Sequence, residues 1–225
     1  MTERDKGIRA PDQDAGARLP LLNEPAPAFH ARTTRGNRTL EDYRGRWLVF
    51  FAHPADFTPV CASEFIAFSK AHDQFQALNC DLLGLSVDSL FAHIAWVSSI
   101  RERFGVEVPF PIVEDPSMAI AKAYGMLHPD ADSSATVRAT FVIDPSGLIR
   151  TITWYPMNVG RSVEELLRLV SALKLSERDK VYTPEGWRPG DAVLAAPPLV
   201  APSPKAWSPS ADQPDWYYRL EAADA

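Results

Sequence analysis

The sequence predicts an α/β fold with a mixed β-sheet flanked by helices. Apolar runs at residues 47–52 and 81–87 have the length and continuous hydrophobicity of strands that are covered on both faces. Segments with apolar residues at helical spacing alternate with these strands along the chain. Two further β-rich runs, joined by a tight turn, precede a last helical pattern, so a sheet with strands of both directions is expected.

The first elements are a hairpin, a central strand and a helix. Residues 29–40 alternate weakly around Gly36, as expected of a β-hairpin. Residues 47–52 are apolar on both faces and predict a central strand. A helical pattern then runs from residue 59 to about residue 77, with phenylalanines on one side at Phe65, Phe68 and Phe75.

A second strand and helix follow. Residues 81–87 indicate another buried strand, and the pair Asp88-Ser89 offers a cap for the helical pattern after it. Gly105 can end that helix in the left-handed conformation, which glycine adopts without strain. The apolar residues assigned to this helix are Phe91, Ile94, Val97, Ile100 and Phe104.

Three short elements and a long helix complete the domain. Residues 110–113 predict a short strand between prolines, and Ser117 can cap a short helix over residues 118–124. The β-rich runs 137–143 and 148–154 are joined by Asp-Pro-Ser-Gly, a strong tight-turn signal. A capping box opens the last helix at Ser162 and Glu165, and its apolar residues are Leu166, Leu169, Val170 and Leu173.

Composition and charge limit the classes of function. The chain has 225 residues, enough for one domain with an appendage, and 46% hydrophobic residues are ample for a packed core. The net charge of −6 and the pI near 5.4 argue against nucleic acid or anionic membranes as partners. No apolar run approaches the roughly 18 residues of a membrane span.

The N-terminus and the cysteine content suggest a compartment. Residues 1–18 are polar and charged, so they predict a flexible tail and lack the apolar centre of a secretory signal. Two cysteines without such a signal favour the reducing cytoplasm, where a free thiol persists. No zinc-ligand cluster is visible in the sequence.

The composition changes after Lys174. Eight prolines lie between Pro184 and Pro214, so residues 176–225 are expected to form an irregular, extended C-terminal extension after a domain at residues 19–175. Large aromatic residues rarely stay in water on an idle tail. Either the extension wraps on its own domain or it covers a second subunit. Its large aromatics are Trp187, Trp207, Trp216, Tyr217 and Tyr218.

Cys61 lies in the first turn of the helix that follows the strand at residues 47–52. Thr58 is a natural N-cap, and Pro59 suits the first helical position because its missing N–H costs nothing there. The positive end of the helix then favours the thiolate of Cys61. A helix terminus supplies only about 0.3–1 kcal/mol, whereas a predominant thiolate needs roughly 2.7 kcal/mol. An arginine is therefore expected nearby; the alternative is an inert structural cysteine.

Residues 51–61, Phe-Ala-His-Pro-Ala-Asp-Phe-Thr-Pro-Val-Cys, resemble the active-site signature of the peroxiredoxins. The core of the signature is Pro54-x-x-x-Thr58-x-x-Cys61, and the longer form resembles the one-cysteine, peroxiredoxin 6-type branch. The resemblance implies a thioredoxin-like fold for the domain. It also implies that Cys61 is the peroxidatic cysteine, which attacks a peroxide oxygen and becomes a sulfenic acid.

The resemblance extends to two arginines. Arg138, in the strand predicted at residues 137–143, looks like the arginine of the family that stabilises the thiolate and binds peroxide oxygens. A guanidinium suits both roles because it stays charged and presents several donors in one plane. The alternative is a surface arginine on an edge strand. Arg161 resembles a second arginine near the same pocket and is also expected to bind substrate.

Three further residues of the signature have implied roles. The hydroxyl of Thr58 is expected to cap the helix and to contact the thiolate or the peroxide. Pro54 is expected to shield the sulfur from water. His53 is expected to have a structural role or to line the substrate pocket, because an ionised nucleophile needs no base. No function is assigned to the remaining histidines, His30, His72, His93 and His128.

Cys80 is either a resolving cysteine or a buried packing residue. In the two-cysteine branches of the family the resolving residue sits elsewhere, commonly near the C-terminus, where this sequence has no cysteine. Packing is therefore the favoured role. The sulfenic acid is then expected to be reduced by an external thiol such as thioredoxin or glutathione.

Residues 183–191 resemble the C-terminal extension of the one-cysteine peroxiredoxins, which implies an arm exchanged within a homodimer or a higher oligomer. Some animal members of the family also act as phospholipases through a Gly-x-Ser-x-Gly element before the active-site strand. Here that place reads Gly45-Arg46-Trp47-Leu48, with Arg46 in place of the serine. No phospholipase activity is expected by that route.

These features predict a thiol peroxidase with an antioxidant role, which reduces hydrogen peroxide and organic hydroperoxides without a metal or organic cofactor. The alternative is a peroxide sensor that relays oxidation to a partner protein, and a slow reaction with peroxide would favour it. A thioredoxin-like disulfide oxidoreductase would need Cys-x-x-Cys, but Thr58 occupies the position three before Cys61.

Overall fold

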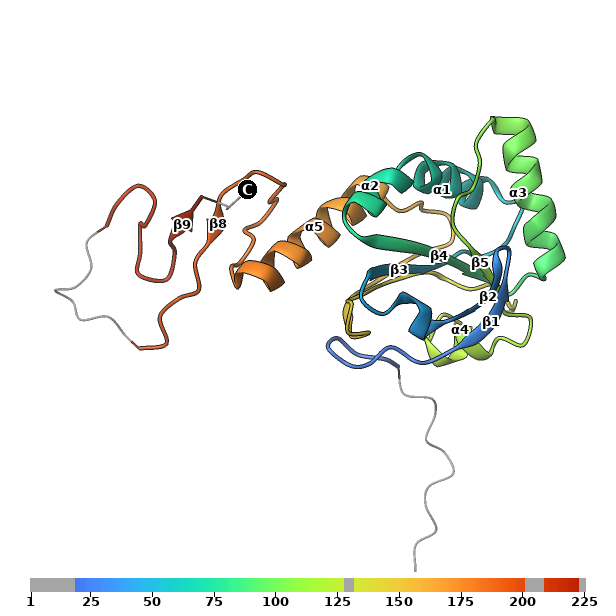
Figure 1. The fold of residues 1–225 in the computed structure, drawn as a ribbon, viewed down its shortest axis with the longest axis horizontal. Helices are drawn as coiled ribbons and strands as arrows, with labels where there is room; N and C mark the ends of the chain where they lie inside the picture. The colour runs from blue at the N-terminus through green and yellow to red at the C-terminus, as the bar shows by residue number, and fades with distance from the viewer. Residues whose placement is uncertain (1–18, 128–131, 201–208, 223–225) are drawn as a thin grey trace, which may run out of the picture.

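The computed structural model describes residues 19–127, 132–200 and 209–222, and the predicted tail at residues 1–18 lies outside this part. A seven-stranded sheet with the order β2-β1-β5-β4-β3-β6-β7 forms the centre of the fold (Figure 1). The elements in chain order are β1 (His30–Thr33), β2 (Gly36–Thr39), a 3-10 helix (Leu40–Tyr43), β3 (Trp47–Ala52), α1 (Pro59–Lys70), α2 (His72–Ala77), β4 (Cys80–Ser86), α3 (Leu90–Phe104), β5 (Ile112–Glu114), α4 (Ala119–Ala123), β6 (Arg138–Ile143), β7 (Ile149–Tyr155), α5 (Val163–Asp179), β8 (Val193–Leu194) and β9 (Leu220–Glu221).

The sheet is mixed, as the sequence predicted. β3 is parallel to β4, and β4 is parallel to β5. β6 is antiparallel to β3 and to β7, and β1 is antiparallel to β2 and to β5. All six residues of β3 are buried, which explains its continuous hydrophobicity.

Helices cover both faces of the sheet, and Figure 1 shows α1 and α2 on the side opposite to α4. Successive residues of β3 point into two different cores. Val49 and Phe51 belong to the core that includes residues of α1, α2, α3 and α5. Leu48 and Phe50 belong to the core that includes residues of the 3-10 helix and α4. This arrangement fixes the end of β3, from which the chain turns into α1.

Most of the predicted end signals are confirmed. Ser89 Oγ accepts a hydrogen bond from Ala92 N at 3.3 Å, and Gly105 ends α3 with φ of 66°. Ser162 Oγ accepts a hydrogen bond from Glu165 N at 3.1 Å at the start of α5. The two predicted hairpins are β1–β2 and β6–β7.

The predicted single helix at residues 59–77 is two helices. α1 ends at Lys70 and α2 begins at His72. Between them, Ala71 has φ of −93° and ψ of 0°, although its amide still donates to Ala67 O at 3.1 Å. The sequence did not indicate this break, because alanine favours helix and neither glycine nor proline marks the position.

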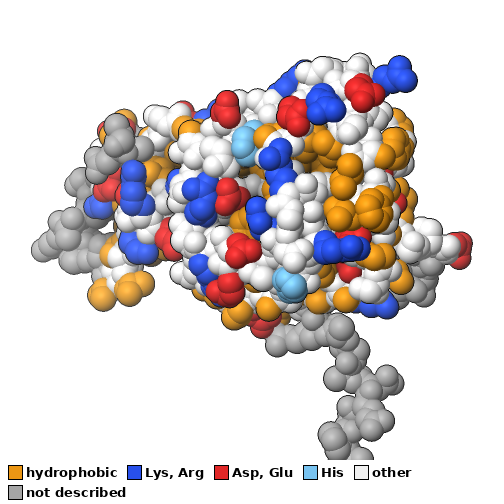
Figure 2. Space-filling model, turned by 45° about the vertical axis from the view of Figure 1, so that its right-hand side comes forward, with side chains coloured by type: hydrophobic (Ala, Val, Ile, Leu, Met, Phe, Trp, Pro, Cys, Tyr) orange, Lys and Arg blue, Asp and Glu red, His pale blue; other side chains and the backbone are white. Residues whose placement is uncertain are grey.

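The buried face of α3 also differs from the prediction. Phe91 and Ile94 are exposed, whereas His93, Trp96 and Ile100 are buried. His93 turns inward because both of its ring nitrogens find hydrogen-bond partners in the core. A prediction from the spacing of apolar residues counts histidine as polar, and it therefore assigned the wrong side of α3 to the core. Figure 2 brings this side of the molecule forward and shows hydrophobic side chains gathered on it.

The C-terminal extension begins beyond α5 and projects away from the sheet (Figure 1). Its first part turns back onto α5, where Trp187 is buried against Ala172 and Val193. Arg168 Nη1, on α5, donates to Trp187 O at 3.1 Å. Further along, the two-residue strands β8 and β9 pair with each other, while Trp216, Tyr217 and Tyr218 are exposed. Trp207 lies outside the described residues.

No helix in the described part of the chain is both long enough and apolar enough to cross a membrane.

Candidate active site

Cys61 occupies the first turn of α1, directly beyond the end of the central strand β3. Its side chain is completely buried and the cysteine is free. The connection from β3 contains Phe57 in the left-handed conformation, with φ of 56°. This conformation is unfavourable for a bulky residue, and such strain often marks a functional loop.

Thr58 is the N-cap residue of α1 by position, with an extended backbone, but its hydroxyl does not cap the helix. Instead, Oγ1 donates to Ala55 O at 2.8 Å. The predicted capping hydrogen bond is therefore wrong. The turn at Phe57 brings the carbonyl of Ala55 within reach, and the hydroxyl proton is used there.

Arg138 reaches Cys61 from the start of β6. Its Nη1 donates to Cys61 Sγ at 3.4 Å. Its Nε and Nη2 both donate to Met157 O, at 2.9 Å and 2.6 Å, which fixes the guanidinium plane. The arginine is buried on a strand between β3 and β7, so the alternative of a surface arginine on an edge strand is wrong.

Arg161 joins the same group through Glu64. Its Nε donates to Glu64 Oε1 at 2.9 Å, its Nη2 to Glu64 Oε2 at 2.8 Å, and its backbone N to Glu64 Oε1 at 2.8 Å. Arg161 Nη1 donates to Thr140 Oγ1 at 3.1 Å, and the guanidinium lies 5.1 Å from the centre of the Phe51 ring. Arg161 thus shares Glu64 with Arg138, and only Arg138 of the two donates a hydrogen bond to the sulfur.

Glu64 connects the two arginines, and sequence reasoning missed it. Besides its bonds from Arg161, its Oε2 accepts from Arg138 Nη1 at 2.8 Å. Burial by itself raises the pKa of Glu64, but the hydrogen bonds and charge of Arg161, with that of Arg138, lower it overall. One signal was available, since Glu64 follows Cys61 by three positions and shares its helix face.

The charges of this buried group do not cancel. Arg138 and Arg161 carry two positive charges, and Glu64 supplies one negative charge. Buried charges are stable only when they are paired. The excess positive charge lies beside Cys61 Sγ, through Arg138 Nη1. An anion at the sulfur position would balance it.

A second buried network holds the loop before α1. His53 Nε2 lies 2.9 Å from Asp56 Oδ1, and His93 Nδ1 lies 2.7 Å from Asp56 Oδ2. His93 Nε2 lies 3.2 Å from Val113 O. Burial raises the pKa of Asp56, but the two histidines lower it overall, so Asp56 is a carboxylate. The network ties the signature loop to α3.

Burial lowers the pKa of His53, which is therefore neutral and donates from Nε2 to Asp56. Its Nδ1 has no hydrogen-bond partner among the described residues. His53, Asp56 and His93 also offer ligand atoms within 4.8 Å of one another, a spacing that a metal ion could use. The sequence did not indicate this cluster, because His93 of α3 lies far in sequence from the loop that holds His53 and Asp56.

Pro54 is buried next to His53 in the loop, and its shielding of the sulfur stays a prediction. Cys80, by contrast, lies at the start of β4, paired in register with Trp47 at the start of β3. Cys61 follows the far end of β3. Five residue steps of a strand span about 16 Å, well beyond the roughly 7 Å limit between the Cα atoms of a disulfide.

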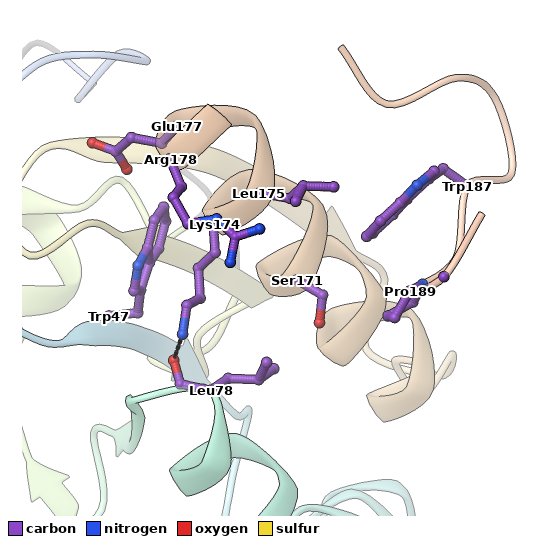
Figure 3. Close-up of a pocket in the computed structure, with 10 residues that line it drawn as sticks. Trp47, Leu78, Ser171, Lys174, Leu175, Glu177, Arg178, Trp187 and Pro189 are labelled. Atoms are coloured by element: carbon purple, nitrogen blue, oxygen red, sulfur yellow. Dashed lines mark hydrogen bonds between the residues drawn. The ribbon is translucent and has the colours of Figure 1, made fainter. Parts of the chain in front are cut away.

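A pocket of about 760 Å³ lies away from Cys61, between the start of β3, α5 and the extension (Figure 3). Trp47 and Leu78 form one side, and Trp187 and Pro189 of the extension lie on the other (Figure 3). Lys174 Nζ donates to Leu78 O across its floor.

Two family models match the chain. The model of the AhpC/TSA family matches residues 22–152, and the model of the C-terminal domain of 1-Cys peroxiredoxin matches residues 172–201. A peroxiredoxin of Aquifex aeolicus is 53% identical over 172 residues, which cover 76% of this chain and 78% of that protein. A peroxiredoxin of Ignicoccus hospitalis is 43% identical over 212 residues, which cover 92% of this chain and 90% of that protein.

Solved structures with the same fold include two peroxiredoxins. A mutant of the peroxiredoxin 6 of Arenicola marina aligns with a TM-score of 0.79 and 29% identity, covering 91% of this chain and 98% of that chain. A yeast mitochondrial 1-Cys peroxiredoxin aligns with a TM-score of 0.79 and 37% identity, covering 91% of this chain and 100% of that chain. That structure was described as the basis of a thiol resolving mechanism via glutathione and thioredoxin systems.

Proposed function

The chain belongs to the AhpC/TSA family and is a peroxiredoxin with the 1-Cys C-terminal domain, and we propose that Cys61 is the cysteine that attacks the peroxide. It is thus a thiol peroxidase with an antioxidant role. The observation that carries the assignment of Cys61 is the 3.4 Å contact from Arg138 Nη1 to its sulfur, within a buried group of excess positive charge. This charge stabilises the thiolate, which is the nucleophilic form.

The reaction transfers one oxygen to sulfur. Cys61 Sγ⁻ attacks the terminal oxygen of R–O–OH, the S–O bond forms and the O–O bond breaks. The products are the sulfenic acid S–OH and the anion RO⁻, which takes a proton and leaves as water or alcohol. Negative charge moves from sulfur to the leaving oxygen during this step, so the donors of Arg138 can stabilise it throughout.

The other signature residues support this step in different ways. Thr58 has used its hydroxyl proton on Ala55 O, so its oxygen is free to accept a hydrogen bond from the peroxide O–H. Pro54 excludes water from the sulfur. His53 is a buried neutral ring, and its hydrogen bond to Asp56 holds the signature loop in place. Arg161 is a positioning residue, because its bonds to Glu64 hold the carboxylate that in turn orients Arg138.

The sulfenic acid is returned to the thiol by an external reductant. One thiol R′SH forms a mixed disulfide with Cys61 and releases water, and a second thiol releases Cys61 and leaves R′SSR′. Cys80 is placed too far away to resolve Cys61 within the chain. The yeast relative that uses glutathione and thioredoxin systems supports thiols of this kind as reductants. Two free cysteines also fit a reducing compartment such as the cytoplasm.

The extension serves as an arm of a homodimer. Its first part packs on its own α5 through Trp187. Its last part carries Trp216 and Tyr217, which are 40% and 56% exposed, more than aromatics of this size normally are on an idle surface. A second copy of the chain would cover them and enter the pocket between α5 and the extension, where apolar surface predominates.

Peroxide turnover tests the proposed function. The purified protein should consume hydrogen peroxide when glutathione, or thioredoxin with its reductase, is supplied. A reagent that reacts with sulfenic acids should label Cys61 after exposure to peroxide, and mass spectrometry locates the label. Labelling at Cys80 alone would overturn the assignment.

Light scattering tests the arm separately. The full chain should be a dimer, and a chain that ends at residue 200 should dissociate into monomers at a higher protein concentration than the full chain does. An equal dimer affinity for both chains would refute the arm without touching the peroxidase.

A further inference from the structure

A second pocket, which is mainly polar, lies near the starts of β3 and β4, whereas Cys61 lies beyond their far ends. It has a volume of about 590 Å³ and is lined by the β1–β2 hairpin, α2, the start of β4 and the segment before β5. β3 and β4 are parallel and start together, and Cys61 follows the far end of β3. The pocket is therefore separate from the peroxide site.

Two cations line this pocket without a carboxylate partner among the described residues. Most arginines in the described part of the chain form ion pairs, but Arg35 and Arg38 do not. Arg35 Nη2 donates to Val108 O at 2.9 Å, and Arg38 Nη1 donates to Asn37 O at 2.9 Å. A guanidinium has five N–H donors, so each side chain retains donors for a ligand.

The two carboxylates in the pocket are already engaged. Asp81 accepts from Arg46 Nε at 2.7 Å and from Arg46 Nη2 at 3.0 Å, which neutralises it. Asp42 Oδ2 accepts from Thr39 N at 2.8 Å. Arg35 and Arg38 together outweigh the single remaining charge of Asp42, so the pocket carries an excess of positive charge.

Two buried polar groups of the pocket residues also have unused hydrogen-bonding capacity. His72 Nδ1 has no hydrogen-bond partner among the described residues, and the hydroxyl of Tyr43, which is only 8% exposed, has no acceptor for its proton there. Burial raises the pKa of Tyr43 against the smaller effects of the charge of Arg38 and of the hydrogen bond from Arg38, so the hydroxyl keeps a proton that it can donate. Because buried polar groups nearly always use their hydrogen-bonding capacity, two such groups in one cationic pocket indicate a polar ligand.

We propose that this pocket binds a small organic anion through a phosphate or carboxylate group held by Arg35, Arg38 and Tyr43 Oη. Arginine presents paired donors that match the oxygens of either group. Leu82 and Phe110 add apolar surface to the lining, so the anion carries a short apolar body beside its charged group.

Isothermal titration calorimetry on the full chain tests this site with inorganic phosphate, phenyl phosphate and benzoate. We expect at least one of the two aromatic anions to bind more tightly than inorganic phosphate, and the stronger of the two identifies the charged group. Arg35→Gln, Arg38→Gln and Tyr43→Phe should each weaken that binding at least about tenfold, as expected for charge-assisted hydrogen bonds. Thermal unfolding of each variant checks that it is folded.

Arg101→Gln is the matched control, because Arg101 is exposed on α3 and also has no carboxylate partner among the described residues. It should leave binding unchanged, and all four variants should keep the peroxide reaction rate. An absence of binding by all three anions would overturn the proposal. So would equal weakening by Arg101→Gln, which would indicate unspecific attraction, or inorganic phosphate binding as tightly as both aromatic anions.

Discussion

Cys61 and Cys80 are both free and completely buried, but the groups around the two sulfurs differ in charge. Cys61 accepts from Arg138, whose neighbours give the surroundings an excess positive charge. Cys80 donates weakly to Asp81 O at 3.6 Å, and burial, with a smaller effect of the Asp81 charge, raises its pKa to about 12.

This comparison separates burial from reactivity. Desolvation disfavours any thiolate, so a buried cysteine is inert unless fixed positive charge compensates for the lost water. At Cys80 burial has the largest effect, and the nearby cations Lys174 and Arg46 offset it only in part. At Cys61 two guanidiniums accompany one carboxylate, and Arg138 contacts the sulfur directly. The charged groups in contact with the sulfur, and not its exposure, therefore distinguish the two cysteines.

The largest expected effect comes from removing each sulfur in turn. Cys61→Ser should abolish the reaction with peroxide, because it removes the sulfur that Arg138 contacts. Cys80→Ser should leave the first turnover unchanged, since it removes only a packing residue. Stopped-flow measurement of sulfenic acid formation compares the two. Equal loss in both variants would show that the cysteines act together.

Removing the cation beside Cys61 should have the next largest effect. Arg138→Gln should slow the peroxide reaction by about 10²–10³-fold, the usual loss for one donor to a developing anion. Arg150→Gln, on the neighbouring strand β7 and away from the sulfur, is the control and should react normally. A rate for Arg138→Gln close to that of the wild type would place the source of the reactivity elsewhere.

Arg161 should matter for stability more than an exposed arginine does. Arg161→Met leaves Glu64 buried with one cation, and breaking a buried ion pair typically costs about 3–5 kcal/mol. Arg44→Met removes an exposed pair with Glu41 and should change stability little. Urea unfolding gives both values. Similar losses in the two variants would mean that the buried group does not depend on Arg161.

The smallest expected effect is the loss of unfolding free energy at alkaline pH that Cys80 causes. Its folded pKa of about 12 lies above its ordinary value of 9.0, so its contribution to stability is complete below 9.0 and disappears as the pH rises towards 12. Between about pH 8 and pH 10 the wild type should lose roughly 1 kcal/mol of unfolding free energy through this group. Burial raises the pKa of Tyr43 and Tyr124 as well, but they are unchanged in Cys80→Ser. Urea unfolding of that variant should show a shallower decline; an identical decline would contradict the account of Cys80.

Most of the fold followed from local signals in the sequence. A few neighbouring residues were enough to predict each of these features: the buried strand β3, the helix caps at Ser89 and Ser162, and the turn between β6 and β7. The exceptions depend on tertiary packing. The break at Ala71 has no local marker, and α3 buries His93 because its partners come from other elements.

The residues of the candidate site also fall into those that local motifs predict and those that depend on tertiary packing. Cys61, Arg138 and Arg161 were predicted from motifs, and the structure brings them into one buried group. The pairing of Glu64 with Arg138 and that of Asp56 with His93 were missed, because in each pair the partners lie far apart in sequence. For Glu64, only its place on the same helix face as Cys61 was a local signal. The hydroxyl of Thr58 was assigned to the wrong partner for a related reason: the strained turn at Phe57 decides which carbonyl it meets.

Alkylation of the two thiols at neutral pH tests most directly whether the cation beside Cys61 makes it the reactive cysteine. Iodoacetamide modifies cysteines in their nucleophilic form, and mass spectrometry of the folded protein reports Cys61 and Cys80 separately. Cys61 should be modified much faster than Cys80, and Arg138→Gln should remove most of this difference. Modification of Cys80 at the same rate as Cys61 or faster would contradict the central claim.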